Sequence, residues 1–356
     1  MQPLLLNYSQ LNPQQVLDAL DAVDLRGDGR ILQLNSYENR VFQLFLEDGS
    51  AVVTKFYRPG RWSDAQILEE HSFALELAAA EVPVVPPLVL RRSIDAGSAA
   101  STASTAVQLQ GDPPTLATWD TPEGQHRFAV FQRCAGREPE LQDPEALRQL
   151  GRFIGRMHAV GARRSFLHRH HLQAAADGAE ALQTLLHLDA IPPTDAGSWQ
   201  SACKQALLAV NAAFDHVQSQ SELKTLRLHG DCHLGNVLWR DGAPHVVDLD
   251  DAMQGPAVQD LWMLVSGDPQ SMSSQLRWLL EGYEQFFDFD DRELALIEPL
   301  RTLRMVRHSA WLARRWSDPS FPISFPFFGQ ASYWHQQSAQ LREQLQLMQE
   351  AAQRWA

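Results

Sequence analysis

The segment between residues 226 and 249 constrains the fold most, because short β-prone runs interrupt a half of the chain that is otherwise helical. These runs are Leu226–Leu228, Val237–Trp239 and His245–Val247. The polar turns between and after them contain Asp231, Asn236 and Asp248. Two carboxylates and an amide at the ends of adjacent small strands can place oxygen ligands around Mg²⁺ beside a base. Phosphoryl transfer needs that combination of groups.

Each of these three residues, taken alone, is as compatible with an ordinary turn, because Asp and Asn favour turns for backbone reasons. The ordered set favours a reactive site. In that interpretation Asn236 and Asp248 hold the metal against a nucleotide. Asp231 then accepts or orients the hydroxyl proton of the acceptor.

The first third of the sequence has the pattern of an antiparallel sheet followed by a helix. The expected strands are Ile31–Leu34, Arg40–Leu46 and Ala51–Tyr57. The Asp48-Gly49 pair suits a tight hairpin turn between the last two. Ser63 and Gln66 match a capping box, which predicts a helix from there to about Ala80.

The hydrophobic period becomes helical at Pro144. Asp143 favours a helix start, and apolar residues recur at helical spacing to about His158. Helical patterns dominate the remainder of the chain. Further strands are expected near Leu88–Arg91, Ala106–Gln110 and Arg127–Gln132. Residues 93–105 are rich in Ser, Ala, Gly and Thr and are predicted to form a mobile loop.

These patterns predict an α+β fold with two lobes. Residues 1–132 should form a β-rich, nucleotide-binding lobe. Residues 133–356 should form a mainly helical lobe that carries the catalytic loop and the metal site. The two lobes are expected to meet near residues 131–136.

Composition excludes several classes of function. The 356 residues include 30 Lys+Arg and 43 Asp+Glu, and the net charge of -13 provides no global basic field for nucleic acid or anionic lipid. No apolar run approaches the roughly 18 to 20 residues that span a bilayer, and the start lacks a signal-peptide pattern. Three widely spaced cysteines indicate neither a disulfide framework nor a zinc site. We therefore expect a cytoplasmic monomer without a nucleic-acid or membrane partner.

Two motifs resemble those of a known family. They are His229-Gly230-Asp231-x-His233-x-x-Asn236 and Val247-Asp248-x-Asp250-Asp251. Both are similar to the catalytic loop and the metal-binding segment of the aminoglycoside phosphotransferase branch of the protein-kinase-like fold. The runs at 34–41, 55–59, 66–71 and 255–263 narrow the resemblance to bacterial stress response kinases. It covers most of the chain, residues 93–105 excepted.

The resemblance implies a bilobal, ATP- and Mg²⁺-dependent serine/threonine protein kinase with ATP as the phosphoryl donor. It implies that Asp231 and Asp248 are catalytic, Asp231 as the proton acceptor, and that Asn236 and Asp248 are the Mg²⁺ ligands. It also implies that Lys55 contacts the α- and β-phosphates.

Two further nucleotide-binding residues follow from the same resemblance. Glu70 matches the helix glutamate that forms a charge pair with Lys55, and Glu69 is its rival, because only one of two adjacent helix residues faces the lobe interface. Ser36 resembles a serine of the loop that covers the phosphates. That loop has no G-x-G-x-x-G pattern, and residues 35–39 must turn over the phosphates instead.

Two other functions remain open. Pro256 follows Asp248 by only eight positions, so the long activation segment on which protein kinases lay a peptide is missing. This favours a small-molecule hydroxyl kinase, for an aminoglycoside, choline or homoserine-like acceptor. A nucleotide-binding regulator with little turnover is the other alternative. An arginine-rich run could form an anionic acceptor site or a solvated helix face, and its members are Arg301, Arg304, Arg307, Arg314 and Arg315.

Overall fold

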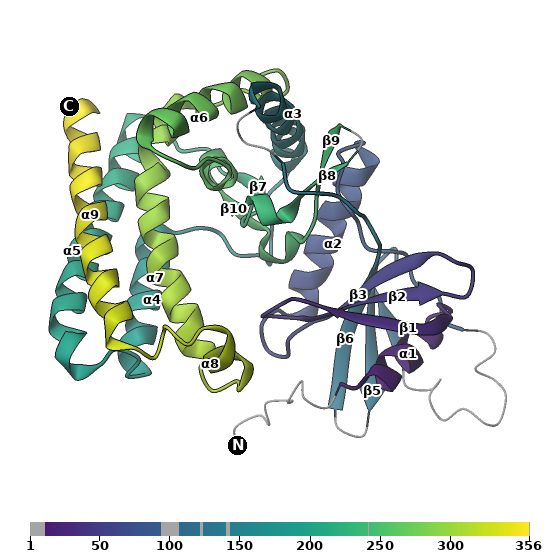
Figure 1. Cartoon of the computed structure of the whole chain (residues 1–356). Helices are drawn as coiled ribbons and strands as arrows, with labels where there is room; N and C mark the ends of the chain where they lie inside the picture. The colour runs from purple at the N-terminus through teal and green to yellow at the C-terminus, as the bar shows by residue number, and fades with distance from the viewer. Residues whose placement is uncertain (1–10, 94–106, 122–123, 140–142, 241, 356) are drawn as a thin grey trace.

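The N-terminal part of the computed structural model is built on one antiparallel sheet (Figure 1). The structure describes residues 11–93, 107–121, 124–139, 143–240 and 242–355, so nearly all of the loop predicted at 93–105 lies outside the described residues. The strand order is β1-β2-β3-β6-β5-β4. The strands are β1 (Gly27–Leu34), β2 (Arg40–Leu46), β3 (Ala51–Phe56), β4 (Val107–Gln110), β5 (Leu116–Thr121) and β6 (Gly124–Gln132).

The predicted hairpin and the helix after it are both present. Gly49 takes the positive φ of 84° that the turn between β2 and β3 requires. Helix α2 (Asp64–Ala79) begins at Ser63, whose hydroxyl and the side chain of Gln66 form the expected capping box. One face of α2 packs beneath the sheet and the other on the helical half.

Three details of this half differ from the sequence prediction. Leu88–Arg91 is extended backbone but not a sheet strand, because Leu88 and Leu90 each donate one hydrogen bond outside a ladder, to Val130 and Pro114. The pattern missed strand β5. It also missed helix α1 (Pro13–Asp21), which packs Val16 and Leu20 against the sheet.

The C-terminal part is mainly helical (Figure 1). Its α-helices are α3 (Pro144–Gly161), α4 (Ala174–His187), α5 (Pro193–Gln220), α6 (Pro269–Tyr283), α7 (Ile297–Arg315), α8 (Ser320–Ser324) and α9 (Ala331–Trp355). Helix α3 runs three residues beyond the predicted end. Helices α4, α5, α7 and α9 share one apolar core, in which the indoles of Trp199 and Trp334 pack edge to face. Nowhere in the described ranges is there a helix with the length and apolarity to cross a membrane.

The β insertion predicted between 226 and 249 lies within this helical part. Its strands are β7 (Leu226–Leu228), β8 (Val237–Arg240), β9 (Ala243–Val246) and β10 (Met253–Gly255). Strands β8 and β9 form a hairpin, and β7 pairs with β10, which the sequence did not predict. Short 3-10 helices lie between them at Leu234–Asn236 and Leu249–Asp251, and a third follows β10 at Ala257–Asp260.

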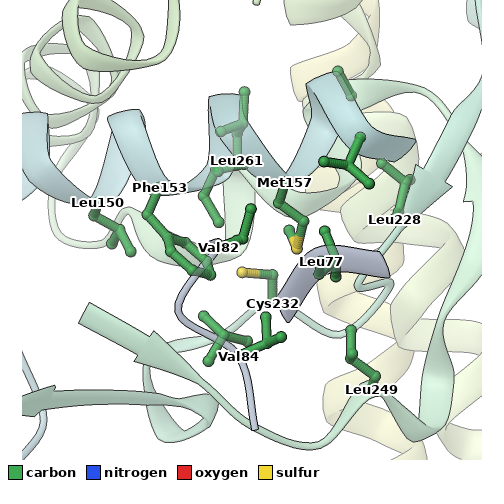
Figure 2. Close-up of a cluster of buried hydrophobic side chains, with 14 of the residues drawn as sticks. Leu77, Val82, Val84, Leu150, Phe153, Met157, Leu228, Cys232, Leu249 and Leu261 are labelled. Atoms are coloured by element: carbon green, nitrogen blue, oxygen red, sulfur yellow. The ribbon is translucent and has the colours of Figure 1, made fainter. Parts of the chain in front are cut away.

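An apolar core holds this insertion against helices α2 and α3. Leu228, Cys232 and Leu249 of the insertion meet Leu77 of α2 and Met157 of α3 (Figure 2). All five side chains are at least 95% buried. Packing of these apolar side chains therefore fixes the turns of the insertion against α2 and α3. The polar side chains of the turns can face away from this core.

Candidate active site

A cleft of about 1410 Å³ lies between the sheet and the helical part. All six of the predicted site residues line it: Ser36, Lys55, Glu70, Asp231, Asn236 and Asp248. The sheet contributes the loop 35–39 and strand β3, and the helical part contributes the catalytic loop and one side of α7. Phe131, Gln132 and Cys134, at the end of β6 where the hinge is expected, line it as well.

The catalytic loop is fixed through its backbone. Asp260 accepts hydrogen bonds from the backbone N–H groups of His229 (2.7 Å) and Gly230 (2.8 Å), and its own carboxylate is fully buried next to His158. Gly230 has a φ of +84°, and a Cβ there would lie 2.2 Å from the backbone oxygen of Asp251. Only glycine therefore fits at this turn. The turn sends Cys232 into the core (Figure 2) and leaves Asp231 in the cleft.

Asp231 has two basic partners. Arg304 of α7 donates to its Oδ1 at 2.6 Å, and His233 lies 3.5 Å from its Oδ2. Burial by itself raises the pKa of this carboxyl group, but the hydrogen bond from His233 and the charge of Arg304 outweigh it and hold the pKa well below the usual value. Asp231 is therefore an ionised carboxylate at neutral pH, and its oxygens can accept a hydrogen bond from an acceptor hydroxyl.

Asn236 and Asp248 have the chemistry of Mg²⁺ ligands. The amide nitrogen of Asn236 donates to the backbone oxygen of Asp231 at 3.0 Å, which leaves the amide oxygen as the free acceptor. The Asp248 side chain is 51% exposed, and its backbone has a φ of +64° that is unusual for a non-glycine residue. Mg²⁺ commonly takes one or two carboxylates with phosphate oxygens and water, so this donor set fits.

Lys55 lies among three acidic groups. Its ammonium contacts Asp248 at 2.6 Å and Asp250 at 3.9 Å. Burial would lower the pKa of Lys55, but the charges of Asp248, Asp250 and Glu70 raise it above the usual value. The expected direct ion pair with Glu70 is not among the ion pairs of the described residues. Asp248 takes its place because it comes closer to the ammonium.

The two candidate glutamates on α2 face different surroundings. Glu70 is 2% exposed, and burial raises its pKa although the charge of Lys55 lowers it. Glu69 instead accepts backbone hydrogen bonds from Leu167, His168 and Arg169 at 2.5–2.8 Å. Glu69 therefore anchors the loop before α4, and Glu70 is the glutamate whose charge acts on Lys55.

The loop over the cleft contacts the helical part directly. Ser36 accepts a hydrogen bond from the backbone N–H of Asn39 at 3.3 Å, and its side chain is exposed. Glu38 in the same loop pairs with Arg315 of α7 at 3.0 Å and accepts a hydrogen bond from the indole of Trp311. The ring of Tyr37 lies 4.7 Å from that of Phe325. The loop is therefore tethered across the cleft by charge and by aromatic contact.

Sequence reasoning missed two residues that brace the metal-binding segment. Arg61 contacts Asp250 and Asp251, each at 2.6 Å, and Asn39 donates to Asp250 at 3.1 Å. The sequence does hold one sign of Arg61. The run Arg58-Pro59-Gly60-Arg61 lies between β3 and α2 and fits neither the strand pattern before it nor the helix pattern after it. The charges of Lys55 and Arg61 hold the pKa of Asp250 below its usual value although burial raises it.

The histidine-rich run at 167–171 has a structural role. Arg169 is buried and donates to the backbone oxygens of Asp250 (2.5 Å) and Ala252 (2.8 Å). His170 contacts Asp177 at 2.9 Å. In the described part of the chain, no three His, Cys, Asp or Glu side chains are grouped so as to hold a metal by themselves.

Comparison with known proteins identifies the family. The profile of the phosphotransferase enzyme family matches residues 30–297. Stress response kinase A of Escherichia coli (strain K12) is 41% identical over 343 residues, which cover 96% of this chain and 95% of that protein. The chain belongs to the phosphotransferase enzyme family. A further relative, named serine/threonine protein kinase RdoA, from Salmonella typhimurium (strain LT2), is 40% identical over the same share of both chains. These relatives confirm the resemblance drawn from the motifs and make the chain a kinase.

Solved structures of the phosphotransferase type share the fold. A microcompartment-associated aminopropanol kinase matches with a TM-score of 0.67 at 16% identity, covering 95% of this chain and 98% of that one. An amicoumacin kinase in complex with AMP-PNP, Ca²⁺ and Ami matches with a TM-score of 0.62 at 19% identity, covering 90% of this chain and 93% of that one. The predicted protein-kinase-like fold, with a sheet followed by a mainly helical part, is confirmed.

Proposed function

We propose that this chain is a serine/threonine protein kinase of the stress response kinase A type, which transfers the γ-phosphoryl group of ATP to a protein hydroxyl. The observation that carries the proposal is the single cleft lined by Lys55, Asp231, Asn236 and Asp248. A lysine, a base and two oxygen ligands in one cleft are the parts that phosphoryl transfer requires. Relatives with kinase names over nearly the full length support it.

Each of these residues has a distinct role in the proposal. Lys55 contacts the α- and β-phosphates, Ser36 and the loop 35–39 cover them, and Glu70 keeps negative charge near the lysine. Asp231 accepts the hydroxyl proton of the acceptor. Asn236 and Asp248 would hold Mg²⁺, which supplies positive charge to the phosphate oxygens when it is bound. The ATP adenine would bind near residues 131–134.

Residues that take no part in the reaction hold these groups in place. Asp260 fixes the backbone of the catalytic loop, and Arg169 and Arg61 fix the segment that carries Asp248. A group that is held in a productive geometry lowers the entropic cost of reaction. We further place the protein in the cytoplasm as a monomer, in a stress response.

A small-molecule hydroxyl kinase is the second candidate. The short connection from Asp248 to Pro256 favours it, because the long segment that protein kinases use to hold a peptide is missing. The arginines that line the cleft on α7 count against a cationic acceptor such as an amino alcohol or an aminoglycoside.

The direct test is incubation of the purified protein with labelled ATP and Mg²⁺. One reaction contains generic protein acceptors, one contains an extract of small metabolites, and one contains EDTA as a control. Label on protein serine or threonine, abolished by EDTA, is the expected result. Label on a small molecule alone would favour the second candidate, and ATP binding without transfer to either would indicate a regulator.

A further inference from the structure

Helix α7 forms the wall of the cleft opposite the sheet, and arginines occur on successive turns of that wall. Arg304, Arg307 and His308 all line the cleft, as Asp231 does. In a chain with a net charge of -13, this is a local concentration of positive charge. Its position next to Asp231 places it where the acceptor has to bind.

Arg304 occupies the oxygen that the reaction needs. Its Nη1 lies 2.6 Å from Oδ1 of Asp231, which is a charge-assisted hydrogen bond. While the guanidinium holds it, that oxygen has one lone pair fewer for an acceptor hydroxyl and its negative charge is partly neutralised. The Arg304 side chain is 45% exposed, so it can turn toward another anion, and His233 then remains 3.5 Å from the Asp231 carboxylate.

Arg307 lies one turn further along and is the less firmly paired of the two. Its nearest acidic partner is Asp177 at 3.8 Å, and its side chain is 37% exposed. The remaining arginines of the run are committed elsewhere. Arg314 pairs with Glu180 and Arg315 with Glu38, both at 3.0 Å, and Arg301 pairs with Glu298 outside the main cleft. Arg304 contacts the base itself, and Arg307 has no ion pair shorter than 3.8 Å among the described residues, so we assign these two arginines to a bound anion.

We propose that the acceptor is a protein segment with an acidic side chain next to its serine or threonine, and that Arg304 and Arg307 bind this carboxylate. Binding draws Arg304 away from Asp231 and frees the base only when the acidic acceptor is in place. The acceptor oxygen then forms its bond to the γ-phosphorus, the bond from that phosphorus to the β-phosphate oxygen breaks, the hydroxyl proton passes to Asp231, and ADP leaves. This inference rests on the proposed function and names its substrate class.

The test uses the full-length protein, labelled ATP and Mg²⁺ with three serine peptides of equal length. The residues that flank the serine are Glu, Gln or Lys. For the wild type we expect kcat/KM to be on the order of tenfold higher for the Glu peptide than for the Gln peptide, and lowest for the Lys peptide. Arg304→Gln should lose this preference mainly through a higher KM for the Glu peptide.

Two further variants make the result specific. Arg307→Gln should also reduce the preference for the Glu peptide over the Gln peptide. It replaces Arg304→Gln as the test if Arg304→Gln does not fold. Arg342→Gln removes an arginine of α9 that bonds to Ser198 outside the cleft, and it should keep the wild-type preference. Thermal unfolding and Mg·ATP binding check that each variant is folded.

Each outcome bears on one of the two proposals. Equal wild-type rates on the Glu and Gln peptides, or a preference that survives in both Arg304→Gln and Arg307→Gln, would overturn the inference and leave the proposed function intact. A wild type that labels generic protein substrates but prefers the Lys peptide would overturn it in the same way. Label on no peptide and no protein would contradict the proposed function itself.

Discussion

Neighbouring residues in this site have opposite surroundings, and the backbone decides which is which. Asp231 lies in the cleft, while Cys232 lies in the core with Leu228 and Met157. Glu69 and Glu70 divide in the same way, one toward the loop before α4 and one toward Lys55. A sequence pattern gives the chemical type of such residues. What each of them does depends on the direction of its side chain, which differs between adjacent residues.

The glutamate pair provides a residue-scale prediction with its own control. Glu70→Gln removes a negative charge close to Lys55 and should slow phosphoryl transfer on the order of tenfold. The double variant Lys55→Ala/Glu70→Gln should be little slower than Lys55→Ala, because the two residues act as a unit. Single-turnover rates with labelled ATP measure both effects.

Glu69→Gln is the matched change on the adjacent residue. It weakens the bonds to the backbone N–H groups of residues 167–169 and should lower the free energy of unfolding by roughly 1–3 kcal/mol, with no coupling to Lys55. Coupling of Lys55 to Glu69 and not to Glu70 would show that the wrong face of α2 was assigned to the nucleotide.

At the scale of elements, two contacts set the geometry around the cleft. The first is the tether from the loop 35–39 to α7 through Glu38, Trp311 and Arg315. The second is the close approach of α3 and α6, where Gly151 and Gly155 of α3 face backbone oxygens of α6. One contact holds the loop over the cleft, and the other supports the helix beneath the catalytic loop.

The tether predicts an effect on nucleotide binding. Glu38→Gln should raise KM for ATP by roughly fivefold, because a lost coupling of about 1 kcal/mol corresponds to such a factor. Steady-state kinetics at varied ATP concentration measure it. Asp28→Asn, which removes an ion pair with Arg30 inside β1, is the control and should leave KM unchanged. Equal KM values for the wild type and Glu38→Gln would mean that the tether does not position the loop.

The contact between α3 and α6 predicts that alanine substitutions at two glycines change the stability of the protein in opposite directions. A Cβ at Gly151 would lie 1.9 Å from the backbone oxygen of Leu279, so Gly151→Ala should destabilise the protein by about 1–3 kcal/mol or more. Gly197 in α5 has open space around it, and Gly197→Ala should stabilise it by up to about 1 kcal/mol through helix propensity. Urea unfolding compares them; a Gly151→Ala protein as stable as the wild type would contradict the close packing.

Across the whole molecule, local patterns predicted most elements and the residue types of the site. The hairpin at Gly49, the capping box of α2 and the strands around Asp231 and Asp248 all depend on neighbouring residues, which a sequence displays directly. Strand β5 and the pairing of β10 depend on partners far away in the chain and were missed.

Contacts between distant segments escaped prediction for the same reason. Arg304 reaches Asp231 across 73 positions, and Glu38 reaches Arg315 across 277. No periodicity encodes such separations. Asp248 likewise lies 193 positions from Lys55, and local patterns could not show that it would be the carboxylate nearest to the ammonium.

We propose that Asp231 is the base for phosphoryl transfer in a cleft that binds Mg·ATP. Asp231→Asn tests it most directly, with calorimetric Mg·ATP binding and single-turnover transfer to a protein acceptor measured on the same preparation. We expect the variant to bind Mg·ATP with nearly unchanged affinity and to transfer phosphoryl at a rate lower by roughly two to four orders of magnitude. Transfer by Asp231→Asn at close to the wild-type rate would contradict it.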